Sequence, residues 1–261
     1  MSSSAVLVKG LAHVAPLVIA WWRCTGTATL MLPALRRVNG REALGIVVAG
    51  LCLAAHFVSW FASIHATSVL HSTLLVTLTP VWVGLVDRFV LGNDPGRAFW
   101  TGTAIAIPGV LLMSSGLGAD ATLGGDLLAL VAGWLASAYV LAGRVVRRTV
   151  DMGTYGGAVP LVAALALTPV LWWSGEPVIG HDPTTWLLLA ACVLGPQLIG
   201  HNGFNWALRY LPAPTVSSFL LLEPVGATLL AGLAFATWPG PVDVLGAAMV
   251  VLGVGMAVRG G

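Results

Sequence analysis

The stretch that decides the fold is residues 65–113, HATSVLHSTLLVTLTPVWVGLVDRFVLGNDPGRAFWTGTAIAIPGVLLM. Residues 209–257 match it without a gap at an offset of 144, with ten identities. Apolar composition alone would give roughly half as many identities, so the aligned prolines and glycines carry the match. These matched residues are Pro80 with Pro224, Pro95-Gly96 with Pro239-Gly240, Gly102 with Gly246, and Gly109 with Gly253. At an offset of 145, His56 also matches His201. The chain therefore contains an internal repeat.

The composition around this repeat is that of a membrane protein. Of 261 residues, 57% are hydrophobic and 8% are charged, with a mean hydropathy of +0.92. Soluble domains have about 25% charged residues. The net charge is only +2, and the basic residues do not form long runs, which excludes a nucleic-acid-binding protein. The three cysteines lie in apolar stretches without CxxC spacing, so neither a disulfide framework nor a metal site is expected.

The apolar stretches predict an all-α polytopic protein of ten helices. The segment before Pro16 has about ten apolar residues, which is half of a membrane crossing at roughly 1.5 Å per residue. We therefore expect a truncated first helix. Nine further spans are expected near residues 17–35, 43–62, 69–91, 98–115, 126–143, 154–173, 185–208, 213–235 and 243–258.

The basic residues predict the orientation of these helices. If the loop after helix two is cytoplasmic, the loops and tail on that side hold ten of the twelve Lys and Arg residues. The opposite loops hold none, so the positive-inside rule predicts a multi-pass protein of the cytoplasmic membrane with its C-terminus inside. Pro80 and Pro224 are then five helices apart and lie on helices of opposite direction. The two halves, 1–117 and 118–261, are expected to form a five-plus-five inverted repeat, the architecture of secondary transporters.

At this point the chain resembles a known family, the EamA-type members of the drug/metabolite transporter superfamily. The resemblance rests on residues 72–113 and on residues 205–258, NWALRYLPAPTVSSFLLLEPVGATLLAGLAFATWPGPVDVLGAAMVVLGVGMAV. AWWRC in helix two and SAYVLAGRVVRR in helix six also fit the family. The resemblance implies ten helices in two inverted halves, cytoplasmic termini and transport of small metabolites. The chain departs from the family in its short first helix and in LGND, where an acidic LGE is common.

Polar residues inside the spans are the candidate binding residues. Gln197, His201 and Asn205 form a polar stripe at spacing four on helix eight, and such a stripe avoids lipid. His56, with Trp60 one turn away, is the repeat-related position on helix three. Each histidine taken alone is more often a packing residue. Two histidines at equivalent positions of inverted halves favour one central site.

Three other residues have competing interpretations. Glu223 lies in the apolar run FLLLEPVGA, and either binds a proton or a cationic substrate or stabilises the helix beside Pro224. Tyr139 on helix six is a candidate for substrate contact or for packing. Arg23, like Lys9, either pairs with Glu223, binds an anionic substrate or extends to the membrane surface. Pro80 and Pro224 are expected to interrupt their helices at the site.

The leading hypothesis is a secondary transporter that exports a small organic solute by alternating access. The chain lacks a phosphate-binding G-x-x-x-x-G-K-[ST] loop, which excludes ATP hydrolysis by this chain as the energy source. The expected partners are a small molecule, the bilayer and protons; a homodimer stays open, and no cofactor is expected. The alternative is a membrane enzyme that acts on a lipid with His56 or His201 as general base. A channel would not explain an inverted repeat with matched prolines.

Overall fold

The computed structural model describes residues 3–67, 69–113, 122–236 and 238–259, leaving the side chains of a few helical residues, Lys9 among them, outside the described residues. Within these ranges the chain is helical and contains no strand. Six segments of the described chain are long and apolar enough to cross a membrane, and the protein is a multi-pass membrane protein. These six are Gly40–Ala66, Leu123–Val146, Met152–Ser174, Pro183–Ala207, Ala213–Leu233 and Pro241–Arg259.

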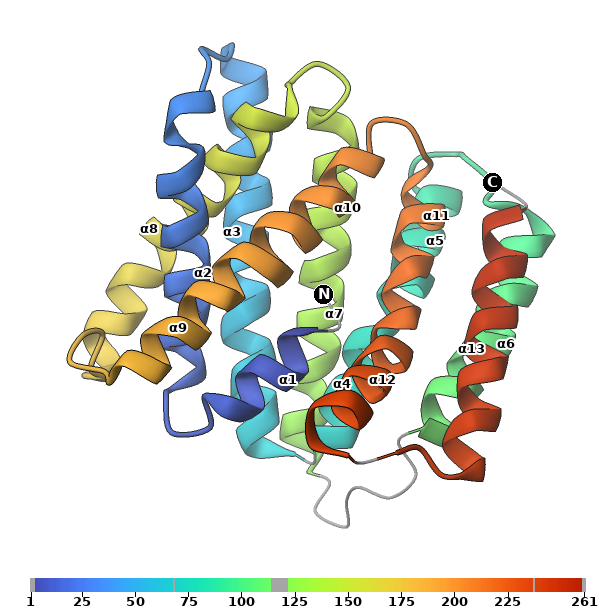
Figure 1. Cartoon of the computed structure of the whole chain (residues 1–261). Coiled ribbons are helices and arrows are strands. Elements are labelled where there is room, and N and C mark those ends of the chain that lie inside the picture. Colours follow the sequence, from blue (N-terminus) through green and yellow to red (C-terminus); the bar gives the residue numbers. More distant parts are fainter. Residues whose placement is uncertain (1–2, 68, 114–121, 237, 260–261) are drawn as a thin grey trace.

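The helices follow one another with short connections (Figure 1). The α-helices are α1 Ser3–Gly10, α2 Pro16–Met31, α3 Gly40–Ala66, α4 Val69–Thr77, α5 Thr79–Phe89, α6 Gly96–Met113, α7 Leu123–Val146, α8 Met152–Ser174, α9 Pro183–Cys192, α10 Asn202–Ala207, α11 Ala213–Ser218, α12 Glu223–Phe235 and α13 Pro241–Arg259. Two short 3₁₀ helices, η1 Leu32–Ala34 and η3 Phe219–Leu222, and one π-helix, η2 Val193–His201, complete the described elements.

Polar caps begin several of the long helices. Asn39 and Glu42 form a reciprocal capping box at α3, and Asp151 accepts from the Thr154 backbone at α8. At α9, one carboxylate oxygen of Asp182 accepts from two backbone N–H groups and the other accepts from a threonine hydroxyl. Hydrogen bonds to an ionised carboxylate favour the charged form, and those from the Thr185 hydroxyl and backbone hold the pKa of Asp182 below its usual value.

Each matched proline follows an interruption of its helix. α4 ends at Thr77 and α5 begins at Thr79, so the break falls just before Pro80. In the second half, the 3₁₀ turn η3 separates α11 from α12, whose second residue is Pro224. Proline lacks an N–H and its ring clashes with the preceding turn, which accounts for breaks at these places.

Close helix pairs build the molecule. α6 packs along α13, α3 along α7, and α2 along α8. In Figure 1, α6 starts at the upper end and α13 starts at the lower end, so this pair is antiparallel. A Cβ atom added to Gly102 would lie 2.2 Å from the Gly253 carbonyl oxygen, and one added to Gly109 would lie 2.6 Å from that of Gly246. Glycine is therefore required where these backbones meet.

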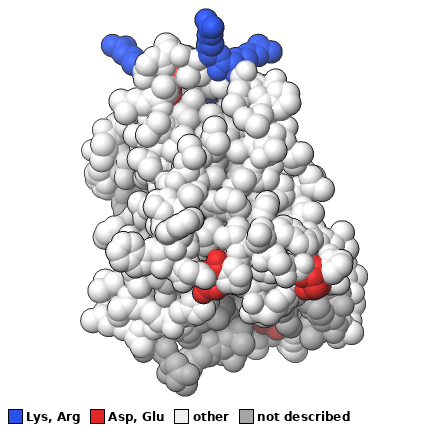
Figure 2. Space-filling view, turned by 90° about the vertical axis from the view of Figure 1, so that its left-hand side faces the viewer, with Lys and Arg blue, Asp and Glu red and all other residues white. Residues whose placement is uncertain are grey.

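Charged side chains are divided between the two ends of the bundle. On the face drawn in Figure 2, Lys and Arg side chains gather at the upper end, and most of the visible Asp and Glu lie in the lower half. At the upper end, Arg144 of α7 donates to both carboxylate oxygens of Asp87 on α5, at 2.9 and 3.0 Å. Asn93 also donates to Asp87, at 3.1 Å. This ion pair ties α5 to α7 beside the connection to α6.

Candidate functional site

His56 projects from the middle of α3 into a group of aromatic rings. Its Nδ1 lies 2.9 Å from the Ala132 carbonyl oxygen on α7, and its ring stacks on Trp60 with centroids 5.9 Å apart. The ring of Phe57 lies next to it at 5.4 Å. A neutral histidine that donates from Nδ1 to a carbonyl presents Nε2 as an acceptor. The backbone bond therefore fixes the ring orientation and leaves one nitrogen for another partner.

His201, the repeat-related histidine, contacts the same aromatic group. It ends η2, with its ring centroid 6.4 Å from that of Phe57 and 6.3 Å from that of Tyr139. Phe57 is 1% exposed, so both histidines meet it in the interior of the protein. The two histidines thus share one aromatic neighbour, Phe57, although they are 145 positions apart in the sequence.

Tyr139 and Asn205 join this group to the upper end of α7. The Tyr139 hydroxyl donates to Asn205 Oδ1 at 2.8 Å. The Asn205 carbonyl in turn accepts from Arg147 Nε at 3.0 Å. Arg147 is 1% exposed and also donates to the Val150 carbonyl. Asn205 therefore contributes to a buried hydrogen-bond network as well as to the wall of the site.

Arg23 reaches the group from α2 and does not extend to the membrane surface. Its guanidinium donates to Gln197 Oε1 at 3.0 Å and to Ser4 Oγ at 3.2 Å. It also lies over the Phe57 ring at 5.4 Å. The sequence alone allows three roles for Arg23, and it does not predict Phe57 as a site residue. The available signal was a charge inside an apolar span, which rarely faces lipid.

The sequence predicts one helix over residues 185–208 for the polar stripe, but only part of this range is a regular α-helix. Val193–His201 form a π-helix that contains Pro196. Proline cannot donate the usual backbone bond and follows Gly195 here, which permits the widened turn. Gln197 then contacts Arg23, His201 contacts Phe57, and Asn205 contacts Tyr139. π-Turns are rare and occur often at functional sites.

Glu223 is the least connected of the predicted site residues. It begins α12, is partly exposed and interacts electrostatically with Arg23. Among the described residues, no hydrogen bond or ion pair joins its carboxylate to His56 or His201. The ring contacts thus bring together His56, Trp60, Tyr139 and His201, whereas Glu223 interacts electrostatically with Arg23 and, within the described residues, not with these rings. No group of three metal-ligating side chains occurs in the described part of the chain.

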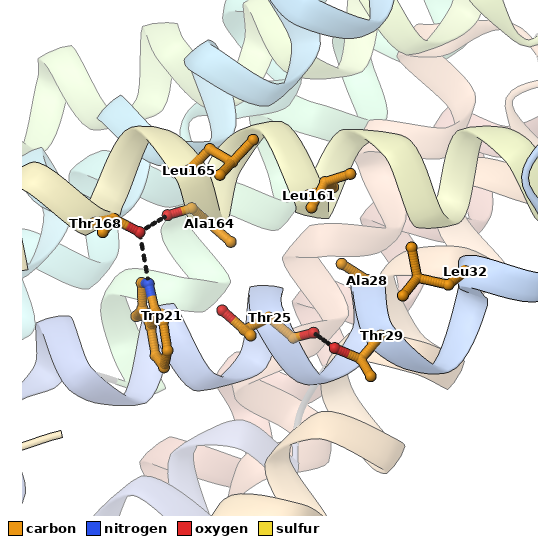
Figure 3. A pocket seen from close by; sticks show the side chains of 9 residues that line it. All are labelled: Trp21, Thr25, Ala28, Thr29, Leu32, Leu161, Ala164, Leu165 and Thr168. Atoms are coloured by element: carbon orange, nitrogen blue, oxygen red, sulfur yellow. Dashed lines mark hydrogen bonds between the residues drawn. The ribbon is translucent and has the colours of Figure 1, made fainter. Parts of the chain in front are cut away.

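A separate pocket lies between α2 and α8 and contains none of the predicted residues (Figure 3). Its volume is about 150 Å³. Trp21 Nε1 donates to Thr168 Oγ1 across one end at 3.0 Å. The lining is otherwise mainly apolar, and its members are Trp21, Thr25, Ala28, Thr29, Leu32, Leu161, Ala164, Leu165 and Thr168.

Known proteins share the fold of this chain and resemble its sequence. A solved crystal structure superposes with a TM-score of 0.86, covering 99% of this chain and 92% of its own at 19% identity, which shows a shared fold. The uncharacterized transporter YwfM of Bacillus subtilis (strain 168) is 26% identical over 217 residues, 80% of this chain and 71% of that protein. The uncharacterized transporter YdfC of the same organism is 26% identical over 191 residues, 70% of this chain and 60% of its own.

The family assignment covers nearly the whole chain. Residues 1–115 and 123–259 match the EamA-like transporter family. The matched ranges contain both histidines, both interrupting prolines and the glycine contacts between α6 and α13. The resemblance noted in the sequence is therefore confirmed. This chain belongs to the EamA-like transporter family of membrane proteins.

Proposed function

We propose that this protein is a secondary transporter that exports a small organic solute across the cytoplasmic membrane by alternating access. The observation that carries the proposal is that the rings of His56 and His201, at repeat-related positions, both contact the ring of Phe57. Repeat-related residues that meet between two halves are where secondary transporters bind their substrates. The site is then made of His56, Trp60, Tyr139, His201, Asn205 and Glu223.

The proposed architecture is ten helices in two inverted halves, 1–117 and 118–261. The glycine contacts support it, because Gly102 meets Gly253 while Gly109 meets Gly246. Under the 144-residue offset, each of these contacts becomes the other. Contacts that exchange in this way are those of a two-fold relation between equivalent surfaces. The opposite directions of α6 and α13 support the same proposal (Figure 1).

Residues near the interruptions would allow the halves to move. Breaks before Pro80 and Pro224 weaken the helices where α5 and α11 pack together. Interrupted helices near the midplane are the recurrent feature of such transporters. We assign the basic end of the bundle and the C-terminus to the cytoplasm, by the positive-inside rule. Glu223 is the proposed proton-binding group of the site.

An enzyme that acts on a lipid is the competing proposal, with His56 or His201 as general base. A base needs a nucleophile or substrate proton within hydrogen-bond reach. The described neighbours of these two histidines are aromatic rings and the Ala132 carbonyl. These contacts favour solute binding over acid–base catalysis.

Transport by purified protein in proteoliposomes tests the proposal. A panel of labelled carboxylates, amines and neutral solutes would be followed with and without a pH gradient. We expect flux of at least one class, an apparent KM raised about tenfold by His201→Ala, and a lost pH dependence in Glu223→Gln. His65→Ala is the matched control, because His65 lies exposed at the end of α3. Absence of flux for every class, or equal effects of His201→Ala and His65→Ala, would contradict the proposal.

A further inference from the structure

Arg23 is a buried cation whose contacts among the described residues are with neutral groups. It is 4% exposed, and its guanidinium contacts Ser4, Gln197 and the ring of Phe57. A charge inside a membrane protein normally faces a partner of opposite charge or a water-filled space. Neutral acceptors and an aromatic face orient the guanidinium without neutralising it. The Arg23 guanidinium thus has no carboxylate in contact with it among the described residues, and it lies at the wall of the proposed site.

Two buried N–H donors of this region lack an acceptor among the described residues. A guanidinium has five N–H groups, and the hydrogen bonds of Arg23 to Ser4 and Gln197 use two of them. Arg23 Nε and Trp60 Nε1 are buried without a hydrogen-bond partner among the described residues. An unpaired buried donor costs about 1–3 kcal/mol. Such donors are retained most readily where a ligand supplies the acceptor.

Glu223 does not form a contact ion pair with Arg23. The two charges interact electrostatically, but the described chain contains no ion pair within 4.0 Å between Arg23 and Glu223. The nearest acceptor to the guanidinium is instead the amide of Gln197, held in the π-helix η2. An amide oxygen orients an arginine while leaving its charge available. A glutamate at position 197 would pair with the guanidinium and neutralise its charge.

We infer that Arg23, oriented by Gln197, binds the carboxylate of an amphiphilic organic anion whose apolar part packs against Phe57. The inference rests on the proposed transport function and deepens it by naming the substrate class. Guanidinium and carboxylate form two parallel charge-assisted hydrogen bonds, which an amide or amine cannot reproduce. The stacked rings of Phe57, Phe61 and Trp60 continue the apolar surface away from the charge.

Binding of three matched compounds tests this inference. The purified full chain in detergent would be titrated by calorimetry with 3-phenylpropionate, 3-phenylpropionamide and 3-phenylpropylamine, which share one ring and differ in the polar end. We expect the carboxylate to bind about tenfold or more tightly than the other two, because only it can pair with the guanidinium. Equal affinities, or tighter binding of the amine, would overturn the inference.

Two variants separate charge from folding. Arg23→Gln should remove the preference for the carboxylate. Gln197→Glu should also remove the preference for the carboxylate, because the new carboxylate would lie within hydrogen-bond distance of Arg23. The substituted side chain is nearly isosteric with glutamine and should fit into η2. Arg37→Gln, at an exposed position after α2, changes the net charge equally and should leave the preference intact. A preference that survives in folded Gln197→Glu would contradict the inference even if Arg23→Gln fails to fold.

The transport assay distinguishes the two proposals. Flux of amines or neutral solutes, with no preference for 3-phenylpropionate in binding, would refute the anion site and leave the transporter proposal standing. Absence of flux for all classes, together with carboxylate binding that depends on Arg23, would refute transport while supporting the anion site. Flux of the carboxylate that Gln197→Glu abolishes would support both.

Discussion

The α6–α13 pair and the aromatic group around Phe57 are built in opposite ways. Between α6 and α13 the backbones touch through glycines, and the surrounding residues are apolar and not aromatic. Around Phe57 the side chains are large, polar or aromatic, and Arg23 Nε and Trp60 Nε1 have no described partner. The first region gains stability from close packing, as membrane helices do. The second keeps polar groups unsatisfied, which lowers stability but permits binding.

Substitutions in these two regions should therefore have different effects on folding and on binding. In the close-packed pair, the backbone itself leaves no room for a side chain, so substitutions are expected to affect folding. In the aromatic group, substitutions that keep the volume are expected to affect binding more than folding.

Gly253→Ala should destabilise the protein strongly. The added Cβ would lie 2.4 Å from the Gly102 carbonyl oxygen and 2.7 Å from the Ala106 nitrogen, and both are backbone atoms that cannot rotate away. Overpacking costs about 1–3 kcal/mol and more where backbone must move. Thermal unfolding in detergent measures it, with Gly255→Ala as control, since a Cβ there meets nothing within 4 Å. Equal melting temperatures for the two variants would contradict the close-packing account.

Asp87→Asn should lower stability by up to about 3 kcal/mol, since removing one partner leaves a buried charge unpaired. The Asp87 side chain is 3% exposed and the Arg144 side chain 18%. Asp94→Asn is the matched control, because Asp94 pairs with Arg88 at 3.7 Å on an exposed surface, where ion pairs contribute little. Chemical unfolding of both variants measures the difference. Similar small losses would mean that α5 and α7 are held by packing alone.

Tyr139→Phe should cost about 1 kcal/mol by leaving Asn205 Oδ1 without its donor, with little change in packing. The double variant Tyr139→Phe, Asn205→Leu should recover part of that loss, because both polar groups are then removed. Unfolding free energies of the single and double variants form the cycle. Additive losses would place Tyr139 and Asn205 outside a coupled network, and the boundary between site and scaffold would have to be redrawn.

Asp182→Asn should have the smallest effect and should show itself only in acid. The threonine hydrogen bonds that lower the pKa of Asp182 stabilise the fold above the ordinary aspartate pKa. This contribution is lost as the pH falls through the folded-state pKa. Asparagine keeps the cap but cannot ionise. The melting temperature of the variant should therefore fall less between pH 5 and pH 3 than that of the parent chain; parallel curves would contradict this.

Much of the fold could be predicted because its signals are local. Apolar stretches, matched prolines and glycines, and the family resemblance indicated a polytopic helical transporter. The polar stripe of Gln197, His201 and Asn205 could be predicted from its spacing of four. The π-helix η2 could not, since a widened turn depends on packing around Gly195 and Pro196. Phe57 gave no signal, because a buried phenylalanine in an apolar span looks like any other. Arg23 gave a signal, but its direction depends on Gln197, which lies 174 residues away.

Cysteine accessibility from the two sides of the membrane is a direct test of alternating access at the position of His201. In a chain with Cys24, Cys52 and Cys192 replaced by serine, a cysteine at position 201 would be labelled by an impermeant reagent applied outside or inside proteoliposomes. Alternating access predicts labelling from either side, while the buried Val250→Cys at the α6–α13 contact is labelled from neither. Labelling of position 201 from one side only, in the presence of measurable transport, would contradict the account.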